Sequence, residues 1–296
     1  MVDGPDKITD VRASSVDDIE AFAAFERFSR FFCEVFSEPG LLDGADCRQS
    51  HAEYLRQYYA HTFGPRIDPL SPRHLKWYRR LVPLLSLPRG SSILDYGGGY
   101  GMDTIFLASL GFEMVFYEIT PPHIEIARWF TDRFRSGCGP LSISFVLAGE
   151  EPAPRGLDAV LLVEVAHHIE PAQRAFDTAA EILRPGGSLF LLEPNFFCPA
   201  VQAYLFKQRG FRTVVTVKNK DTGEEYQWGN EHIRSIPTWT RLAASAGFSL
   251  KGAEFVVPWF FRGPTPQPSR LRRSLERLPL IRDLLASNVT LEYMRL

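Results

Sequence analysis

A glycine-rich turn directly after a short apolar run is the feature that most limits how this chain can fold. Residues 91–120 read SSILDYGGGYGMDTIFLASLGFEMVFYEIT, and glycines at positions 97, 98, 99 and 101 crowd between the first two apolar runs. Glycine lacks a Cβ, so the backbone can adopt positive φ and a ligand can approach it closely. A helix beginning near Gly101 would also offer free N–H groups and the positive end of its dipole. The turn therefore predicts a ligand-binding connection between a strand and a helix.

The spacing of these glycines separates three kinds of binding turn. A dinucleotide-binding turn has the pattern Gly-x-Gly-x-x-Gly, but here Tyr100, Gly101 and Met102 follow Gly99, so the third glycine has the wrong offset. A phosphate-binding loop would end in Gly-Lys-Ser/Thr, which is absent from this turn. The remaining pattern is Asp-x-Gly-Gly-Gly-x-Gly after an apolar strand, with an acid, Glu118, closing the next strand.

From residue 91 onwards short apolar runs alternate with helical patterns. Strands are expected over 92–96, 114–119, 143–148, 158–164 and 188–193, and helices over 101–110, 122–135 and 171–184. Runs such as AVLLV and LFLLE are apolar on both faces, which is typical of a parallel sheet covered by helices on both sides. The pattern predicts an α/β fold with a doubly wound sheet.

Aromatic residues concentrate outside this alternating region. In the helix expected over 18–36, phenylalanines recur every third position from Phe22 to Phe31 and so fan over about half of the helix surface. That helix is either sandwiched between layers or lines a cavity. We expect residues 1–88 to form a helical cap and residues 89–296 the core, with 196–236 inserted as a lid on the substrate side.

A second N-terminal helix, around RHLKWYRRLVPLL, combines aromatic and basic residues. Its basic residues, among them Arg79 and Arg80, are interpreted as a solvated face, with an anion-holding substrate wall as the alternative.

Composition excludes several classes of partner. The 296 residues carry a formal net charge of −2, whereas binding a polyanion requires a strong basic excess or stripe, so no nucleic-acid or membrane partner is expected. No leader and no apolar run of membrane-spanning length is recognisable. Four widely spaced cysteines fit a reducing compartment. We therefore expect a cytoplasmic protein, and a homodimer is possible but not required by the spacing of the aromatic residues.

The turn and its flanking acids resemble those of the class I S-adenosylmethionine-dependent methyltransferases. The resemblance covers roughly residues 75–257 and rests on ILDYGGGYG, EITPPHIEIAR, LDAVLLVEVAHHIEP and ILRPGGSLFLLEPN. It implies a Rossmann-like sheet of seven strands in the order 3-2-1-4-5-7-6, with the last strand antiparallel. It also implies S-adenosyl-L-methionine as the cofactor and a small-molecule methyl acceptor as the partner.

The resemblance also implies which residues hold the cofactor. Asp95 would help to fix the amino group of its methionine half, and Glu118 would accept both ribose hydroxyls, because a carboxylate offers two acceptor oxygens. Glu150, or Glu151 beside it, would lie near the adenine amino group, and Glu164 near the methionine end of the cofactor or its methyl group. The complete set of expected cofactor-binding residues is Asp95, Tyr96, Gly97, Gly98, Gly99, Gly101, Glu118, Ile119, Glu150 and Glu164.

Methyl transfer needs aligned reactants and, for a hydroxyl or a protonated amine, a base that removes a proton. Candidate bases lie in VEVAHHIEP, just past the fourth strand and so at the carboxyl edge of the sheet. His168 is preferred because resembling small-molecule enzymes carry a histidine there, although a packing role is the alternative; His167 is the second candidate. The other histidines lack ligand spacing, so no metal is expected.

In resembling enzymes the acceptor pocket comes from segments outside the core. The candidate substrate residues here are Trp77, Asn195, Tyr204 and Trp228, although each could equally be a core or cap residue. The aromatic content of 13% favours a medium-sized aromatic or apolar acceptor, methylated on oxygen or nitrogen in a biosynthetic pathway. Two alternatives stay open: a non-methylating enzyme of this fold that performs a decarboxylation or rearrangement, and a catalytically silent ligand-binding module.

Overall fold

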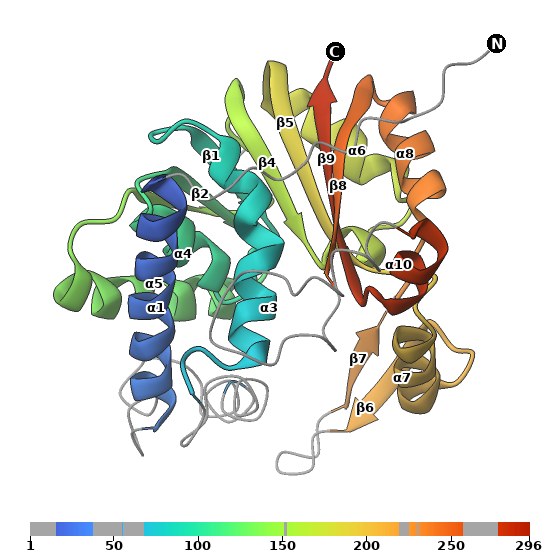
Figure 1. The fold of residues 1–296 in the computed structure, drawn as a ribbon, viewed down its shortest axis with the longest axis horizontal. Helices are drawn as coiled ribbons and strands as arrows, with labels where there is room; N and C mark the ends of the chain where they lie inside the picture. The colour runs from blue at the N-terminus through green and yellow to red at the C-terminus, as the bar shows by residue number, and fades with distance from the viewer. Residues whose placement is uncertain are drawn as a thin grey trace.

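A seven-stranded sheet with helices on both faces forms the centre of the molecule (Figure 1). The structure is a computed structural model, and it describes residues 16–37, 55, 68–150, 153–218, 225–229, 231–256 and 278–296. Within those ranges, none of the helices combines the length and apolar character needed to cross a lipid bilayer.

The order of the strands matches the sequence-based prediction. The sheet contains β1 (Ser92–Tyr96), β2 (Glu113–Glu118), β3 (Ile143–Leu147), β4 (Leu157–Val163), β5 (Leu183–Pro194), β8 (Phe248–Val256) and β9 (Asn288–Arg295). They are arranged in the order β3-β2-β1-β4-β5-β9-β8. The first five strands are parallel, and β9 runs antiparallel to both of its neighbours. The predicted order 3-2-1-4-5-7-6 with an antiparallel last strand is thus confirmed.

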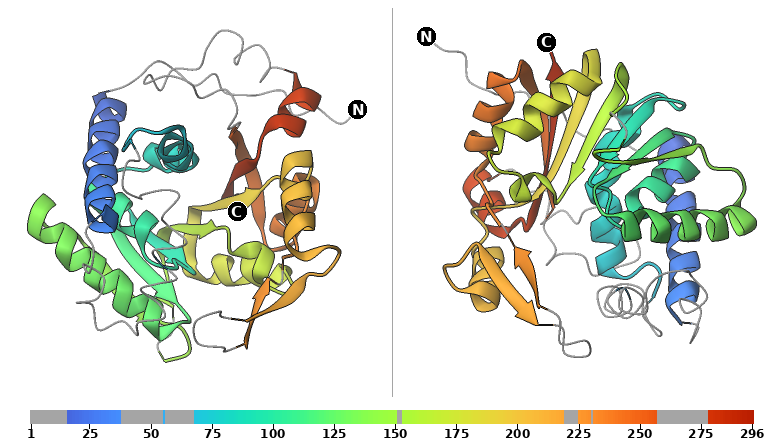
Figure 2. Two further views of the ribbon diagram at one scale, coloured as in Figure 1. Left: turned by 90° about the horizontal axis from the view of Figure 1, so that it is seen from below. Right: turned by 180° about the vertical axis from the view of Figure 1, so that it is seen from behind.

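The helices divide between the two faces of this sheet. Those described are α1 (Val16–Ser37), α3 (Pro72–Leu81), α4 (Met102–Ser109), α5 (Pro121–Cys138), α6 (Gln173–Ile182), α7 (Pro199–Arg209), α8 (Ile236–Ser245) and α10 (Pro279–Leu285), with short 3-10 helices η2 (Val82–Ser86) and η3 (Ala166–His168). Helix α7 and a separate antiparallel ribbon of β6 (Val214–Lys218) and β7 (Glu225–Gly229) lie on the far side of the molecule from α1 and α5 (Figure 2).

Alternation along single strands explains the two-sided core. In β4, Leu161 packs with α1, α3, α4 and α5, whereas its neighbours Val160 and Leu162 pack with α6 and α8. Successive side chains of a strand point to opposite faces. A strand that is apolar at every position is therefore buried on both sides, as the runs AVLLV and LFLLE predicted.

The aromatic N-terminal helix α1 is sandwiched between layers. Phe25, Phe28 and Phe32 are fully buried, and Phe28 stacks on Trp77 of α3, with ring centroids 5.0 Å apart, while its other neighbours include Phe106 of α4 at 5.6 Å. The phenylalanine rings of α1 thus pack against α3 and the helices that cover the sheet, and they do not line a cavity. The division of the chain into a cap of residues 1–88 and a core stays a prediction, since α1 and α3 share one apolar core with α4.

The expected start of the fifth strand is wrong. The sequence predicts a break at LRPGG and a strand over 188–193, but β5 begins at Leu183, directly after α6. Its pairing with β4 skips between Leu183 and Ser188, so the intervening residues bulge out within the strand. Gly186, at φ 75°, makes the turn of this bulge. The residues of LRPGG do form a turn, but this turn lies within β5 and not between α6 and the strand.

The glycine-rich turn is shaped largely by the protein's own packing. A Cβ added at Gly97 would lie 2.6 Å from Val165, and one at Gly98 would lie 2.7 Å from the ring of Phe116. A Cβ at Gly101 would lie 2.9 Å from Ala127. These three glycines are needed because neighbouring side chains press against the turn. The expectation that all four glycines make room for a ligand therefore needs correction.

Substituting Gly98 by alanine should destabilise the fold by about 1–3 kcal/mol, because an added methyl group would overpack the space beside Phe116. Gly137→Ala is a matched control: Gly137 lies in α5 with no atom within 4 Å of an added Cβ, so alanine should stabilise the helix by about 0.5–1 kcal/mol. Urea unfolding measures both changes. Equal stability of the two variants would contradict the packing described for the turn.

Candidate functional site

The carboxyl ends of four parallel neighbours, β2, β1, β4 and β5, meet at one edge of the sheet. The glycine turn leaves β1 there, Glu118 ends β2, Glu164 follows β4, and Glu193 lies next to the end of β5. Open parallel sheets bind ligands at this edge. We therefore build the candidate site from these four strand ends.

Glu118 ties the glycine turn to the neighbouring strand. Its Oε2 accepts a hydrogen bond from the Gly99 N–H at 3.0 Å, and its Oε1 accepts from the N–H groups of Ile119 and Thr120 at 2.8 and 3.1 Å. Burial opposes ionisation, but the nearby His123 and these backbone N–H groups outweigh it and lower the pKa of Glu118. The carboxylate is thus held ionised and directed at the turn.

Gly99 is the position where the turn faces open space. Its φ of 57° lies in the left-handed region that favours glycine. A Cβ added there would meet nothing within 4 Å, unlike one at its three neighbouring glycines. A ligand can therefore approach the backbone at Gly99, next to the Glu118 carboxylate. An ionised acceptor beside an open stretch of backbone fits a ligand with adjacent hydroxyl donors, such as an adenosyl ribose.

Asp95 lies beneath the turn, at 1% exposure. Its Oδ2 accepts a hydrogen bond of 2.5 Å from the hydroxyl of Thr104 in α4. Burial raises the pKa of Asp95 to about 7, and the Thr104 hydrogen bond only partly offsets this. In this arrangement Asp95 fastens the turn to the start of the helix, and its contact with a cofactor amino group stays a prediction.

Glu164 adopts a strained backbone conformation at the end of β4, with φ 51°. Such a conformation costs on the order of 1 kcal/mol for a residue with a Cβ. Its Oε1 accepts hydrogen bonds from Arg80 Nη1 at 2.6 Å and Asn288 Nδ2 at 3.1 Å. Burial opposes its ionisation, but the charges of Arg80 and Lys76 lower the pKa of Glu164. These contacts hold an ionised carboxylate in a fixed orientation beside the turn.

The remaining cofactor candidates lie at the same edge but make few contacts. Tyr96 is half-buried and stacks on Tyr117, with ring centroids 5.2 Å apart. Ile119 is 73% exposed, which leaves an apolar side chain open beside Glu118. Glu150 is exposed in the turn after β3, and Glu151 lies outside the described residues. Their contacts with a cofactor stay predictions.

The two candidate bases have different surroundings. His167 is buried, and its Nδ1 is hydrogen-bonded to the carboxylate of Glu193, which is itself fully buried. His168 is exposed, with its ring centroid 4.0 Å from that of His167. A histidine held by a buried carboxylate has one fixed ring orientation. This geometry favours His167 over His168, the reverse of the preference drawn from the sequence.

Glu193 also fixes the electrostatics of this pair. Burial disfavours a charged His167, but the Glu193 carboxylate outweighs burial and raises the pKa of His167. Burial raises the pKa of Glu193 as well. The other oxygen of Glu193 accepts a hydrogen bond from the N–H of Ala166 at 3.0 Å. The pair is therefore held in one arrangement, with the pKa values of both groups raised.

The segment after β7 covers the second nitrogen of His167. Glu231 Oε2 lies 3.4 Å from His167 Nε2, and the N–H of His232 donates to the carbonyl oxygen of His167 at 2.9 Å. His167, His168 and Glu231 also present ligand atoms within 4.8 Å of one another, a spacing that a metal ion could use. The expectation of no metal rested on the other histidines and did not consider this cluster, so it stays a prediction.

The substrate candidates do not gather around one pocket. Trp77 is packed between Phe28 and Phe106 in the aromatic core. Both N–H groups of the Asn195 amide are used, donating to the carbonyl oxygens of Asp283 and Ala286 at 2.6 and 2.9 Å. The structure thus gives Trp77 packing contacts and Asn195 capping contacts, and an acceptor contact for either stays a prediction.

The other two substrate candidates belong to the insertion. Tyr204 is 61% exposed on α7. Trp228 lies in β7, and its side chain lies outside what the structure describes. The expectation of an acceptor contact stays a prediction for both.

Three residues of the site, Arg80, Glu193 and Glu231, were missed or misread from the sequence. Arg79 and Arg80 were expected on a solvated face, but Arg79 is 8% exposed and Arg80 pairs with Glu164. Glu193 could have been found, because an acid at the end of the apolar run LFLLE must face the edge that carries His167. Glu231 gave no usable signal, since its approach depends on the path of the insertion.

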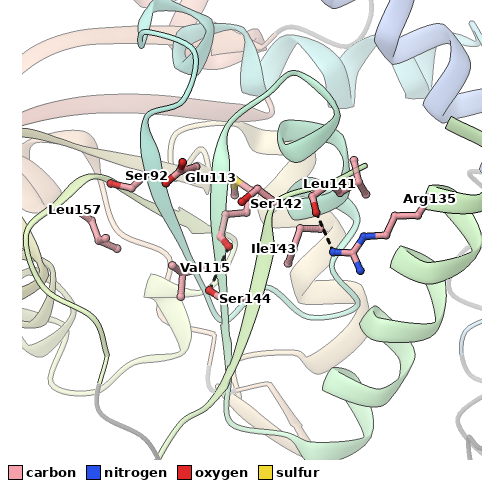
Figure 3. Close-up of a pocket in the computed structure, with 10 residues that line it drawn as sticks. Ser92, Glu113, Val115, Arg135, Leu141, Ser142, Ile143, Ser144 and Leu157 are labelled. Carbon is pink, nitrogen blue, oxygen red and sulfur yellow. Dashed lines mark hydrogen bonds between the residues drawn. The ribbon is translucent and has the colours of Figure 1, made fainter. Parts of the chain in front are cut away.

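A different cavity lies at the opposite edge of the sheet (Figure 3). It has a volume of about 460 Å³ and is lined by residues that include Ser92, Glu113 and Leu157, the first residues of β1, β2 and β4. The Arg135 guanidinium at its rim donates to the carbonyl oxygen of Leu141 at 2.9 Å. Because this cavity lies at the amino ends of the strands, it is separate from the glycine turn and its acids.

Comparison with known proteins identifies relatives. The family described as "Methyltransferase domain" matches residues 66–251. A ubiquinone biosynthesis O-methyltransferase from Xylella fastidiosa (strain 9a5c) is 30% identical over 204 residues, 66% of this chain and 76% of that enzyme. A demethylmenaquinone methyltransferase from Tropheryma whipplei (strain Twist) is 30% identical over 135 residues, 44% of this chain and 54% of that enzyme, so the chain spans about half the length of this relative.

A solved structure agrees with the fold. The PH0226 protein from Pyrococcus horikoshii OT3 superimposes with a TM-score of 0.52 at 16% identity, with 81% of this chain and 99% of that chain covered. At this level of identity the likeness concerns the fold alone.

Replacing Glu118 by alanine should weaken binding of S-adenosylhomocysteine about ten-fold or more, because the ribose hydroxyls would lose a charged acceptor. Glu113→Ala is the matched control, since Glu113 begins the same strand at the opposite edge and should leave binding unchanged. Calorimetry measures both dissociation constants, and circular dichroism checks that both variants are folded. An unchanged constant for a folded Glu118→Ala would refute the assignment of the ribose to this carboxylate.

Proposed function

Since this chain belongs to the class I S-adenosylmethionine-dependent methyltransferases, we propose that it methylates a hydroxyl group on an aromatic small molecule, with His167 as the base. The observation that carries this proposal is the buried hydrogen bond between His167 Nδ1 and Glu193 at the cofactor edge of the sheet. A base at this position serves an acceptor that must lose a proton to become nucleophilic.

The residues at the carboxyl edge suit the cofactor of this family. Glu118 would accept the ribose hydroxyls, and the open backbone at Gly99 would lie along the nucleoside. Glu164, fixed by Arg80, would lie on the methionine side. When bound, S-adenosyl-L-methionine supplies an electrophilic methyl group on a positively charged sulfur. The protein's part is then to hold the acceptor oxygen in line with that methyl group and to exclude water.

His167 acts on the acceptor in this proposal. Glu193 accepts a hydrogen bond from the Nδ1–H group, which leaves the Nε2 lone pair of the neutral imidazole as the proton acceptor. A phenol has a pKa near 10, so a base with a pKa raised above that of free histidine is better matched to its proton. Glu193 is therefore a positioning residue, since it acts through His167.

Glu231 lies where the acceptor hydroxyl would have to bind, 3.4 Å from His167 Nε2. We infer that the acceptor displaces this carboxylate, and that the segment carrying Glu231 moves as the acceptor enters. This supports our proposal that the insertion of residues 196–236 forms a lid on the acceptor side. We likewise propose that residues 1–88 cap the cofactor side of the site, since α3 supplies Arg80, which binds Glu164.

The names of the relatives support the class of acceptor. The Xylella fastidiosa relative is named as an O-methyltransferase of ubiquinone biosynthesis and the Tropheryma whipplei relative as a demethylmenaquinone methyltransferase. Both names concern quinones, whose reduced forms carry hydroxyl groups on an aromatic ring. We extend only this chemistry, a ring hydroxyl on an apolar molecule, to the present chain.

Glu193→Gln should lower the pKa of His167 by about one unit or more, since it removes the negative charge that favours the imidazolium. The raised pKa keeps His167 protonated to higher pH in the wild type, so the neutral base should appear at lower pH in the variant. NMR titration of the His167 ring carbons measures this shift. Glu292→Gln, whose carboxylate pairs with Lys251 and not with His167, is the control, and equal titration midpoints in all three proteins would refute the pairing.

A panel of catechols and quinols incubated with the cofactor should yield a product heavier by one methylene group, as read by mass spectrometry. His167→Ala should reduce kcat by about 100-fold or more, whereas His168→Ala should reduce it far less. If kcat fell more in His168→Ala than in His167→Ala, the base would be His168. Loss of activity with a chelator, restored by added metal, would assign the cluster with Glu231 to a metal ion and contradict the role of His167 as a base.

A further inference from the structure

Helix α7 and its flanking residues expose an unusual number of aromatic side chains. The aromatic residues concerned, with their exposed fractions, are Phe196 (43%), Phe197 (44%), Tyr204 (61%), Phe206 (54%) and Phe211 (96%). The rings form pairs: Phe196 with Phe197 at 5.4 Å and Phe206 with Phe211 at 5.0 Å. We call residues 196–212 the aromatic surface. Exposed aromatic residues concentrated in one segment usually mark a binding surface.

The attachment of α7 explains why these rings face outward. Leu205 is buried and Val201, one turn earlier, is half-buried. Residues four apart lie on the same face of a helix, so a single narrow face holds α7 to the protein. The opposite face carries Phe206 and leads to Phe211, and neither ring has a role in the core.

The charge of this segment is entirely of one sign. Between residues 196 and 218 the sequence contains Lys207, Arg209, Arg212 and Lys218 and neither aspartate nor glutamate. Lys207 and Arg212 are exposed, beside Phe206 and Phe211. The chain as a whole has a net charge of −2, so the remainder is clearly acidic. The overall charge therefore conceals one basic and aromatic surface.

We propose that the aromatic surface docks on an anionic lipid bilayer. Aromatic rings insert at the boundary between head groups and acyl chains, and neighbouring lysine and arginine residues bind the anionic head groups. This is a peripheral contact, which the sequence-based expectation of no membrane partner overlooked because it relied on the total charge.

Two other occupants fit the surface less well. A second copy of this chain in a symmetric contact would bring the basic residues of both copies together, and like charges oppose that. A nucleic-acid strand needs a basic path that continues across the protein, but the insertion continues over residues 221–231 with four acidic and no basic residues. A bilayer can be bound by the aromatic surface alone, without basic residues elsewhere on the protein.

The position of the aromatic surface suits delivery of an apolar acceptor, an argument that rests on the proposed function. Phe196 follows Glu193 by three residues, and α7 lies near the lower edge of the molecule beside the ribbon of β6 and β7 (Figure 1). An apolar acceptor dissolved in the bilayer could then pass to His167 without crossing water.

Co-sedimentation of the full chain with vesicles tests the docking without any acceptor. We expect binding to phosphatidylcholine vesicles that contain phosphatidylglycerol, and far less to phosphatidylcholine alone. Phe206→Ser with Phe211→Ser should weaken it about ten-fold or more. Lys207→Gln with Arg212→Gln should do the same, since each basic residue contributes several-fold in affinity at an anionic surface.

The matched control is Ile19→Ser with Arg241→Gln, which removes an exposed apolar and an exposed basic side chain elsewhere and should leave vesicle binding unchanged. Binding of S-adenosylhomocysteine, measured on each preparation, shows that the protein is folded and keeps this test separate from the proposed function. Absence of binding to anionic vesicles would overturn the proposal. The proposal would also be overturned if the protein formed a dimer that the phenylalanine variant dissociates. The same holds if the protein bound an RNA oligonucleotide and both variants lost that binding while vesicle binding was unchanged.

Discussion

The site depends on one acidic side chain that closes the end of a strand and holds the turn of its neighbour. Glu118 accepts hydrogen bonds from the backbone of Gly99, Ile119 and Thr120, so the two parallel strands are joined at the edge where we propose that the cofactor binds. Because these N–H groups stabilise its negative charge, the carboxylate remains ionised although it is 5% exposed. The turn is therefore preorganised for a ligand that brings its own hydroxyl donors.

The sheet and its binding edge could be predicted because they depend on local patterns. Apolar runs bounded by turns gave the strands, and the glycine spacing with Glu118 distinguished this turn from dinucleotide and phosphate loops. The start of β5 was missed because Gly186 forms a bulge within the strand, and the local sequence of such a bulge is the same as that of a helix end. The reason for most of the glycines was also missed, since Phe116 reaches the turn from β2 and Val165 from the segment that follows β4.

The surroundings of the proposed base could be predicted only in part, because they depend on contacts between distant segments. His167 and Glu193 come together because β4 and β5 are adjacent and parallel, which the predicted strand order already implies. Glu231 reaches His167 through the insertion, whose path no sequence pattern specifies. Total charge likewise says nothing of how charge is distributed, because it averages the basic segment around Phe206 with an acidic remainder.

The central claim is that the carboxyl edge binds the adenosyl cofactor between Glu118 and His167. A crystal structure of the protein with S-adenosylhomocysteine tests it most directly. The account predicts both ribose hydroxyls within hydrogen-bond distance of Glu118, the nucleoside along Gly99, and the sulfur on the side of His167. A ribose held by other residues, or a sulfur facing away from His167, would contradict it.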